Sequence, residues 1–257
     1  MIMTKSRILL GLCVVIVAAV FAGTASADPF VGPPICSSAG MALSGNYNEI
    51  TLSGNAYVPE GATLNVRGNL RLTAGSCLDA FSLSTVHVHG NILVGAHAVL
   101  GLGCTPGSIG PVPPCREQTT ADTVDGSVIA HEALTMYLDG DTIHGDVVST
   151  GGGPGPTLNP YINFPIKDNT IGGNLMVSGW QGAWFGVVRN VVGGKVVLVK
   201  NVGLTAPEGV PDSTEVATNT IAGDLICLDN SPTAQIGDSG GTINTVGGAK
   251  VGQCKAV

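Results

Sequence analysis

The sequence predicts an all-β chain wound into a solenoid, a coil of short strands stacked on one another. One pattern recurs: Asn or Asp, then usually Thr, a β-branched residue, any residue and Gly. Its six copies begin at Asp122, Asp141, Asn169, Asn190, Asn219 and Asn244. Self-similarity with a period in the twenties is typical of solenoids. The 38 glycines and the low aromatic content of 4% indicate many tight corners around a lean aliphatic core.

Alternating apolar residues follow most copies, and this period of two indicates a strand with one buried face. In the earlier part of the chain, Gly54-Asn55, Gly68-Asn69 and Gly90-Asn91 align in the same way. Each has a leucine ten residues after its glycine, namely Leu64, Leu78 and Leu100. We therefore expect the coil to begin before the first full copy of the pattern.

Three copies carry a second echo 11 residues later, which predicts that half a coil is one strand and one corner. The echoes pair Asn190 with Asn201, Asn219 with Asn230, and Asn169 with Trp180. Stacked coils would place equivalent Asn side chains above one another, where each amide donates to and accepts from its neighbours. We interpret these asparagines as an internal ladder and not as a functional site.

Residues 1–27 resemble a secretory signal peptide, with Lys5 and Arg7, an apolar run and Ala25-Ser26-Ala27 as the cleavage site. The exported chain, 28–257, is predicted to be one β-helical domain that is not anchored in the membrane. Without Lys5 and Arg7, it has nine basic and 18 acidic residues, a net charge of −9. This charge disfavours nucleic acid and anionic lipid as partners.

Six cysteines remain after the signal, an even number that predicts disulfides in an oxidising compartment. Spacing alone leaves fifteen pairings open. Cys104 with Cys115 would close a Pro-rich loop and Cys227 with Cys254 would staple the last coil, which leaves Cys36 with Cys77. Two loops interrupt the repeat, at about 104–121 and 151–165. Because the pattern resumes after each loop, we interpret them as Gly- and Pro-rich insertions in one domain.

The motif Gly237-Asp238-Ser239-Gly240-Gly241 resembles the segment around the nucleophilic serine of chymotrypsin-like proteases. His131 is the candidate base for such a site. However, the small-residue-His-Cys arrangement of that family is absent, and Ser239 falls between two copies of the repeat. Small turn residues are needed there, so a turn is the favoured interpretation.

His87 and His89 are two residues apart on a predicted strand, so they share a face and are candidate metal ligands. The alignment of Gly68 with Gly90 places Asn65 and Arg67 at the same positions one coil earlier. Because a cation beside His89 disfavours a metal, we interpret the histidines as an ordinary solvent-facing pair and expect no metal or cofactor.

The densest acidic group is Asp139, Asp141 and Asp146, with His144 among them. Carboxylates on a strand edge can bind calcium or act as the acid and base of a glycan-cleaving enzyme. The repeat explains most of this group, because Asp141 occupies the ladder position and Asp146 follows the glycine of its copy. The acidic group is therefore the site of an alternative, enzymatic hypothesis.

Trp180, Trp184 and Phe185 bring both tryptophans of the chain together. Exposed rings on a rigid coil form a flat surface for sugar faces, whereas buried rings would only fill the interior. A bulky ring at the corner position of Trp180 favours an outward orientation. These three residues are the candidate ligand-binding site.

The Gly-Asn-Leu and Asn-Thr-Val-Gly-Gly copies, with the closing Gly252-Gln253-Cys254, resemble exported repeat proteins of high-GC Gram-positive bacteria. The resemblance covers about 44–257 and implies a single-stranded right-handed parallel β-helix. Pectate-lyase-like enzymes share this architecture, but the chain lacks an Arg within an acidic calcium cluster. Bactofilins also stack Gly-rich strands, but they are cytoplasmic and lack disulfides. Right-handedness follows from the general preference of parallel crossovers.

The sequence thus predicts a secreted, non-enzymatic scaffold or binding protein of the cell envelope or extracellular space. Glycan recognition through the aromatic cluster is the accompanying hypothesis. The alternative is a secreted hydrolase or lyase that acts on polysaccharide through the three aspartates, or a serine protease that uses Ser239.

Overall fold

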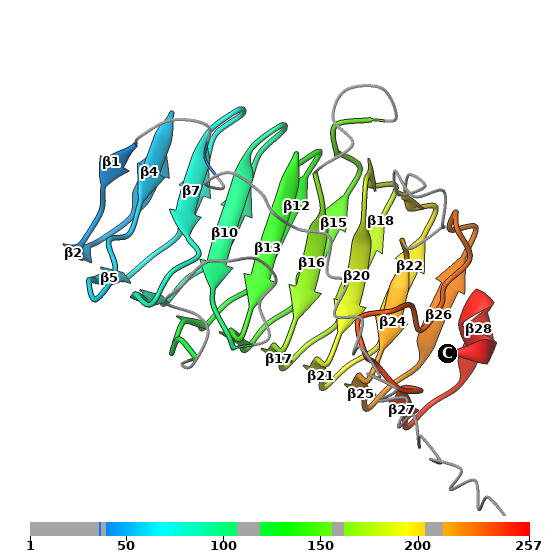
Figure 1. Cartoon of the computed structure of the whole chain (residues 1–257). Coiled ribbons are helices and arrows are strands. Elements are labelled where there is room, and N and C mark those ends of the chain that lie inside the picture. The colour runs from blue at the N-terminus through cyan, green and yellow to red at the C-terminus, as the bar shows by residue number, and fades with distance from the viewer. Residues whose placement is uncertain (1–35, 37–39, 107–118, 156–161, 204–212) are drawn as a thin grey trace, which may run out of the picture.

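The computed structural model describes residues 36, 40–106, 119–155, 162–203 and 213–257, and these form long parallel β-sheets (Figure 1). Three sheets run along the whole described chain, with eight, nine and nine strands. A two-stranded sheet joins β19 (Gln181–Gly182) to β23 (Val202–Gly203), and a short 3-10 helix, η2 (Gln253–Ala256), lies at the carboxyl end. The all-β prediction is confirmed.

We name the three long sheets A, B and C. Sheet A contains β1 (Met41–Ala42), β4 (Asn55–Tyr57), β7 (Cys77–Ala80), β10 (Val99–Gly103), β13 (Thr135–Asp139), β16 (Phe164–Lys167), β20 (Phe185–Val188) and β24 (Glu215–Ala217). Sheet B contains β2 (Gly45–Tyr47), β5 (Thr63–Val66), β8 (Thr85–Val88), β11 (Thr123–Val124), β14 (Thr142–Ile143), β17 (Thr170–Ile171), β21 (Val191–Val192), β25 (Thr220–Ile221) and β27 (Thr245–Val246). Sheet C contains β3 (Ile50–Leu52), β6 (Leu70–Leu72), β9 (Ile92–Val94), β12 (Val128–His131), β15 (Val147–Thr150), β18 (Leu175–Ser178), β22 (Val196–Val199), β26 (Leu225–Leu228) and β28 (Lys250–Gly252).

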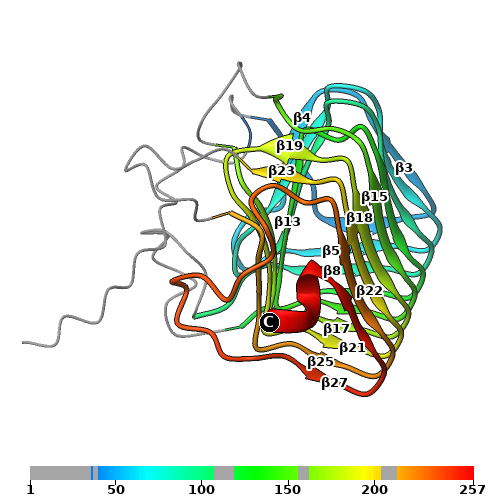
Figure 2. The same ribbon diagram turned by 90° about the vertical axis from the view of Figure 1, so that its right-hand side faces the viewer.

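Successive strands of the chain enter the three sheets in turn, and each strand pairs in parallel with its equivalent in the next coil. Viewed along the coil, the three sheets form three walls (Figure 2). This arrangement is a parallel β-helix, as predicted, and its handedness stays a prediction. The interpretation of half a coil as one strand is wrong, because each coil contributes three strands and three corners.

The core lies between the three walls and is aliphatic. Inward positions of each strand are buried, for example Val196 and Leu198 on β22, while Val197 between them faces outward. Bridges also continue across the predicted insertions: β8 pairs with β11 across the first and β15 with β18 across the second. The coil therefore runs on after each insertion, although residues 107–118 and 156–161 lie outside the described part.

The asparagine ladder is present and is internal, as predicted. Asn190 is fully buried, its side-chain oxygen accepts hydrogen bonds from the main-chain and side-chain nitrogens of Asn169, and its amide donates to Asn219. The same contacts continue to Asn244. A second ladder begins at Trp180, whose main-chain N–H donates to Asn201 at 3.1 Å, which confirms the 11-residue echo.

The alignment of the earlier part of the chain is only partly correct. Gly68-Asn69 and Gly90-Asn91 stack as expected, because the main-chain N–H of Asn91 donates to Asn69 Oδ1 at 2.8 Å. Asn55 instead lies in sheet A, where it pairs with Cys77. Gly-Asn occurs at corners that lead into different sheets, so the dipeptide alone does not identify a sheet.

Two predicted disulfides are present: Cys36–Cys77 with a Cα–Cα distance of 5.7 Å, and Cys227–Cys254 with one of 5.1 Å. The second joins sheet C to helix η2, which places Cys254 in the core. Cys115 lies outside the described residues, so the pairing of Cys104 with Cys115 stays a prediction. Within the described ranges, no helix has the length and apolarity required to span a bilayer.

Candidate metal centre

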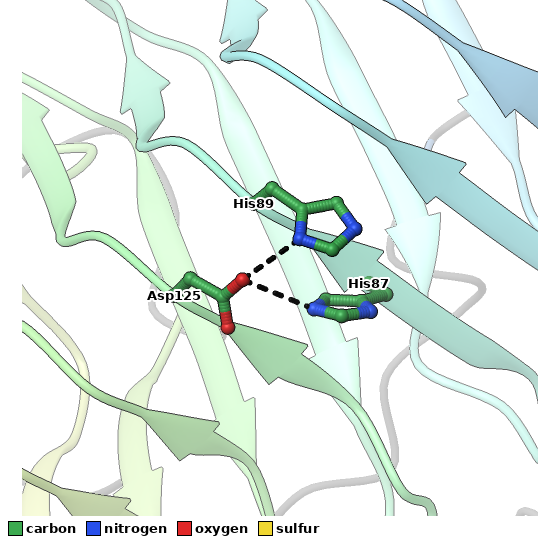
Figure 3. A group of neighbouring side chains, drawn as sticks. All are labelled: His87, His89 and Asp125. Carbon is green, nitrogen blue, oxygen red and sulfur yellow. Dashed lines mark hydrogen bonds and ion pairs between the residues drawn. The ribbon is translucent and has the colours of Figure 1, made fainter.

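His87 and His89 point outward from sheet B at the end of β8, on the same side of the strand (Figure 3). Their alternation with buried Val86 and Val88 explains this orientation, because every second residue of a strand faces the same way. The two imidazole rings lie 3.9 Å apart between centroids and are tilted by 39°. The histidines therefore form one compact pair at the surface, as the sequence predicts.

The next coil adds a carboxylate to this pair. Asp125 directly follows β11, which pairs with β8 so that Thr123 lies beside His87. One oxygen of Asp125, Oδ2, lies 2.8 Å from Nδ1 of His89 and 3.3 Å from Nε2 of His87 (Figure 3). Two histidines and one carboxylate thus converge with their ligand atoms all within 4.8 Å of one another.

A third histidine contacts the same carboxylate from the coil beyond. His144 follows β14, and its Nδ1 lies 3.3 Å from Oδ1, the other oxygen of Asp125. Asp125 is therefore held from both sides, and its side chain is 38% exposed, while that of His144 is 62% exposed. The contact with His144 orients the Asp125 carboxylate, as residues that bond to a metal ligand do in known metal sites.

The electrostatics of the cluster favour an ionised carboxylate. Burial is the largest single influence and raises the pKa of Asp125, but the hydrogen bonds from His89 and His87 and the electrostatic interaction with these two residues together lower the pKa more. The pKa of Asp125 therefore lies below its ordinary value. An ionised carboxylate beside imidazoles is the form that binds a cation.

The spacing of these atoms suits a first-row divalent metal ion. Imidazole nitrogen and carboxylate oxygen are ligands of Zn²⁺, Cu²⁺ and Ni²⁺. With bonds of about 2 Å, a tetrahedral zinc ion places its ligand atoms roughly 3.3 Å apart. The two measured nitrogen-to-oxygen distances, 2.8 and 3.3 Å, are close to this value. The register places Arg67 of the preceding coil beside His89, as predicted, whereas Asp125 lies on the opposite side of β8.

Searches of protein-family models, curated proteins and solved structures give no match to this chain. The interpretation of the site therefore depends on its own geometry.

The three predicted aromatic residues do not form a surface. Trp180 and Phe185 are fully buried, and Trp184 is 5% exposed. The Trp180 ring packs against Phe164 and Phe185 at centroid distances of 5.3 and 6.3 Å, and its Nε1 donates to the carbonyl of Leu134. Expecting an outward ring at this corner was wrong. Gly182 makes room inside, because a Cβ there would overlap the ring.

The predicted acidic group is divided between two corners. Asp139 and Asp141 are buried at the corner between sheets A and B, where the Asp139 main-chain N–H donates to Asp141. Asp146 lies at the next corner and accepts two hydrogen bonds from Asn174, as its repeat position predicts. A third buried acid, Asp122, occupies the ladder position before Asp141. The three predicted carboxylates therefore do not converge on one substrate.

Ser239 is not paired with a histidine. Its hydroxyl donates to Glu215, which also accepts from the main-chain N–H of Asp238 at 2.9 Å. His131 ends β12, four coils from β26 in sheet C, which corresponds to about 19 Å along the coil. The structure therefore does not bring the proposed base to the serine, and the segment joins strands β26 and β27 as a turn would.

Asp125 is the functional candidate that the sequence reasoning missed. It occupies the variable position before the glycine of its repeat, and so do His144 and, in the earlier pattern, His89. Aligning that column of the repeat would have placed the three side chains in successive coils. The constant asparagine column builds the ladder, whereas the variable column contains His89 and Asp125, two of the three candidate ligands.

Proposed function

We propose that this chain is an exported, non-enzymatic binding protein whose β-helix holds a divalent transition-metal ion at His87, His89 and Asp125. The observation that carries the proposal is the convergence of two imidazoles and a carboxylate within 4.8 Å on adjacent coils. His87 lies on β8 and His89 directly follows this strand, and hydrogen-bonded pairing of β8 with β11 fixes Asp125 beside them. The ligands are therefore preorganised by the sheet, which reduces the entropic cost of binding.

Export is supported by the predicted signal peptide and by the two disulfides, because disulfides persist in oxidising compartments. A scaffold role is supported by the uniform stacking of coils, which displays outward side chains at fixed spacing. Glycan recognition is not carried into this proposal, because its aromatic residues are buried. The enzymatic alternative is likewise left aside, since neither the three aspartates nor Ser239 and His131 come together.

Calorimetric titration with Zn²⁺ tests the proposal. The protein should carry no polyhistidine tag and should be freed of metal with a chelator before titration. We expect one equivalent of Zn²⁺ to bind, and His89→Ala to weaken binding by at least about tenfold because one ligand is lost. Asp125→Asn should weaken it comparably, because the amide keeps the shape but not the charge.

His131→Ala is the matched control, since His131 is also exposed but lies on sheet C. Its affinity for Zn²⁺ should equal that of the native chain. Equal binding by the native chain, His89→Ala and Asp125→Asn, all with native thermal stability, would refute the site.

A further inference from the structure

The outward positions of sheet C form a continuous apolar row, which is unusual for the exposed face of a protein. The register places these residues in adjacent strands: Leu93, Ile129, Val148, Met176, Val197, Ile226 and Val251. Ile129 is 41% exposed, and Met176 and Val251 are each 37% exposed. No other described element covers this face in Figure 2. Extended apolar patches of this kind mark interaction sites.

The surroundings of the row are nearly free of charge, although the chain as a whole is acidic. The parallel row on the same face contains Gly95, His131, Thr150, Ser178, Val199 and Leu228. Charged groups lie at the margins: Asp146, Lys195 and Asp224 precede the strands on one side, Glu132, Lys200 and Asp229 follow the strands on the other, and Arg71 lies beyond Leu93. An uncharged centre with a polar rim is the usual anatomy of a protein interface.

We propose that sheet C is the interface of a homodimer, in which a second copy of this chain packs face to face on the row. Both faces are then apolar and have the same strand spacing of about 4.8 Å, so the rows match in period. A two-fold axis parallel to the strands and passing through Met176 makes the seven-residue row self-complementary. Leu93 then faces Val251 of the second copy, and Ile129 faces Ile226.

The antiparallel arrangement of the two coils follows from charge and from shape. It places Arg71 of each copy just beyond Val251 of the other, whereas parallel coils would bring the two Arg71 side chains together. The face also has a hollow of about 420 Å³ beside Gly95 and His131. Leu228, which is 41% exposed, projects from the equivalent row of β26 and would enter this hollow in the second copy.

The size of the face is sufficient for a dimer of modest stability. Seven strands at about 4.8 Å and four residues at about 3.3 Å give roughly 440 Å² per copy. The total, about 900 Å², lies in the range of weak, transient interfaces, so we expect a weak dimer. A second copy is also favoured because cyclic dimers with self-complementary patches are the commonest soluble oligomers.

Sedimentation equilibrium on the full exported chain tests the dimer. We expect the native protein to be dimeric at about 100 µM and Met176→Lys to raise the dissociation constant by at least about 100-fold, because two ammonium groups would meet on the axis. Thr170→Lys is the matched control, since Thr170 is exposed in the same coil but on sheet B. This control should remain dimeric.

A second pair of variants tests the antiparallel register independently of folding. Leu93→Lys and Val251→Glu should each weaken the dimer, and the chain that carries both should regain affinity because opposite charges then face each other. Circular dichroism must show native strand content in every variant. A native chain that stays monomeric, or a Met176→Lys dimer of native affinity, would overturn the proposal.

Discussion

Sheets B and C obey the same stacking rule but display opposite chemistry on their outer faces. The outward row of sheet B is mainly polar: His87, Thr123, Thr142, Thr170, Val191, Thr220 and Thr245. The outward row of sheet C is aliphatic from Leu93 to Val251. Inward positions of both sheets are equally apolar, because both face the same core.

This difference shows which positions folding determines and which it leaves free. An inward residue must be apolar because it fills the core. A one-residue shift in register would turn the whole apolar row of a strand toward solvent. An outward residue has no such requirement, so its chemistry reflects what the face contacts. We therefore assign the polar face of sheet B to a metal ion and the aliphatic face of sheet C to a second copy.

The largest expected effect comes from the buried asparagine ladder at the corner between sheets A and B. Asn190→Ala removes the buried amide that donates to Ile166, Val188 and Asn219 and that accepts from Asn169. Several buried polar groups lose a partner, so the free energy of unfolding should fall by about 3–5 kcal/mol. Urea unfolding measures this loss.

Asn174→Ala is the control for Asn190→Ala, because Asn174 belongs to a corner ladder that is only partly buried. We expect it to cost about 1 kcal/mol. A loss at Asn190 no larger than that at Asn174 would mean that the buried ladder stabilises the coil no more than the corner ladder does.

The carboxyl end of sheet C should depend on its disulfide more than sheet B does. Cys254→Ser opens the link to Cys227, which closes a loop of 27 residues. Loss of such a link costs about 3 kcal/mol by the chain-entropy argument. Hydrogen exchange should show faster opening of β28 and η2, with β14 and β17 of sheet B unchanged. Uniform acceleration over both sheets would contradict this localisation.

Asp122 and Asp141 occupy the inner ladder in place of asparagine, and these buried acids should make the stability of the fold depend on pH. Burial, and then the charges of Asp122 and Asp139, raise the pKa of Asp141 well above its ordinary value. Burial raises the pKa of Asp122 to about 7, although hydrogen bonds from Val86 and Gly103 lower it. The native state thus binds more protons than the unfolded chain above about pH 4, so stability falls as the pH rises toward 7.

Asp141→Asn should remove part of this dependence, because an amide restores the ladder without a charge. We expect the free energy of unfolding to rise by about 1–2 kcal/mol at pH 7.5, and the gain to vanish near pH 4. Urea unfolding across this range is the measurement. A variant that is less stable than the native chain at pH 7.5 would contradict the argument from burial.

The smallest expected effects distinguish the two faces most directly. Val191→Thr completes the polar row of sheet B, and Val148→Thr interrupts the aliphatic row of sheet C. Each should change the free energy of unfolding of the monomer by less than about 0.5 kcal/mol, since both residues face outward. Only Val148→Thr should weaken the dimer, by a few-fold in sedimentation. Equal effects on association would remove the distinction between the faces.

The periodic features of the fold were predictable from the sequence. The Asn column and the echo from Asn190 to Asn201 follow from spacing, whereas the Cys227–Cys254 disulfide is one of several pairings that spacing leaves open. Stacking explains this success, because a side chain that bonds to its own equivalent recurs with the period of the coil. The number of strands in a coil was not predictable, since short strands and corners give no separate signal.

The features that break the period were predicted poorly. Trp180 takes the place of a ladder Asn, and only the nearby Gly182 hints that the interior can accept its ring. Asp125 contacts His89 although the two residues are 36 positions apart in the sequence. This separation is long because an insertion lies between their coils. Their proximity depends on where the chain re-enters sheet B, which local patterns do not determine.

X-ray absorption spectroscopy of the zinc-loaded protein is the most direct test of the metal centre. We predict a first coordination shell with two imidazole nitrogens and at least one oxygen at about 2.0–2.1 Å. Loading His89→Ala should reduce the imidazole contribution by one. A spectrum of the native protein with sulfur ligands, or without imidazole, would contradict binding at His87, His89 and Asp125.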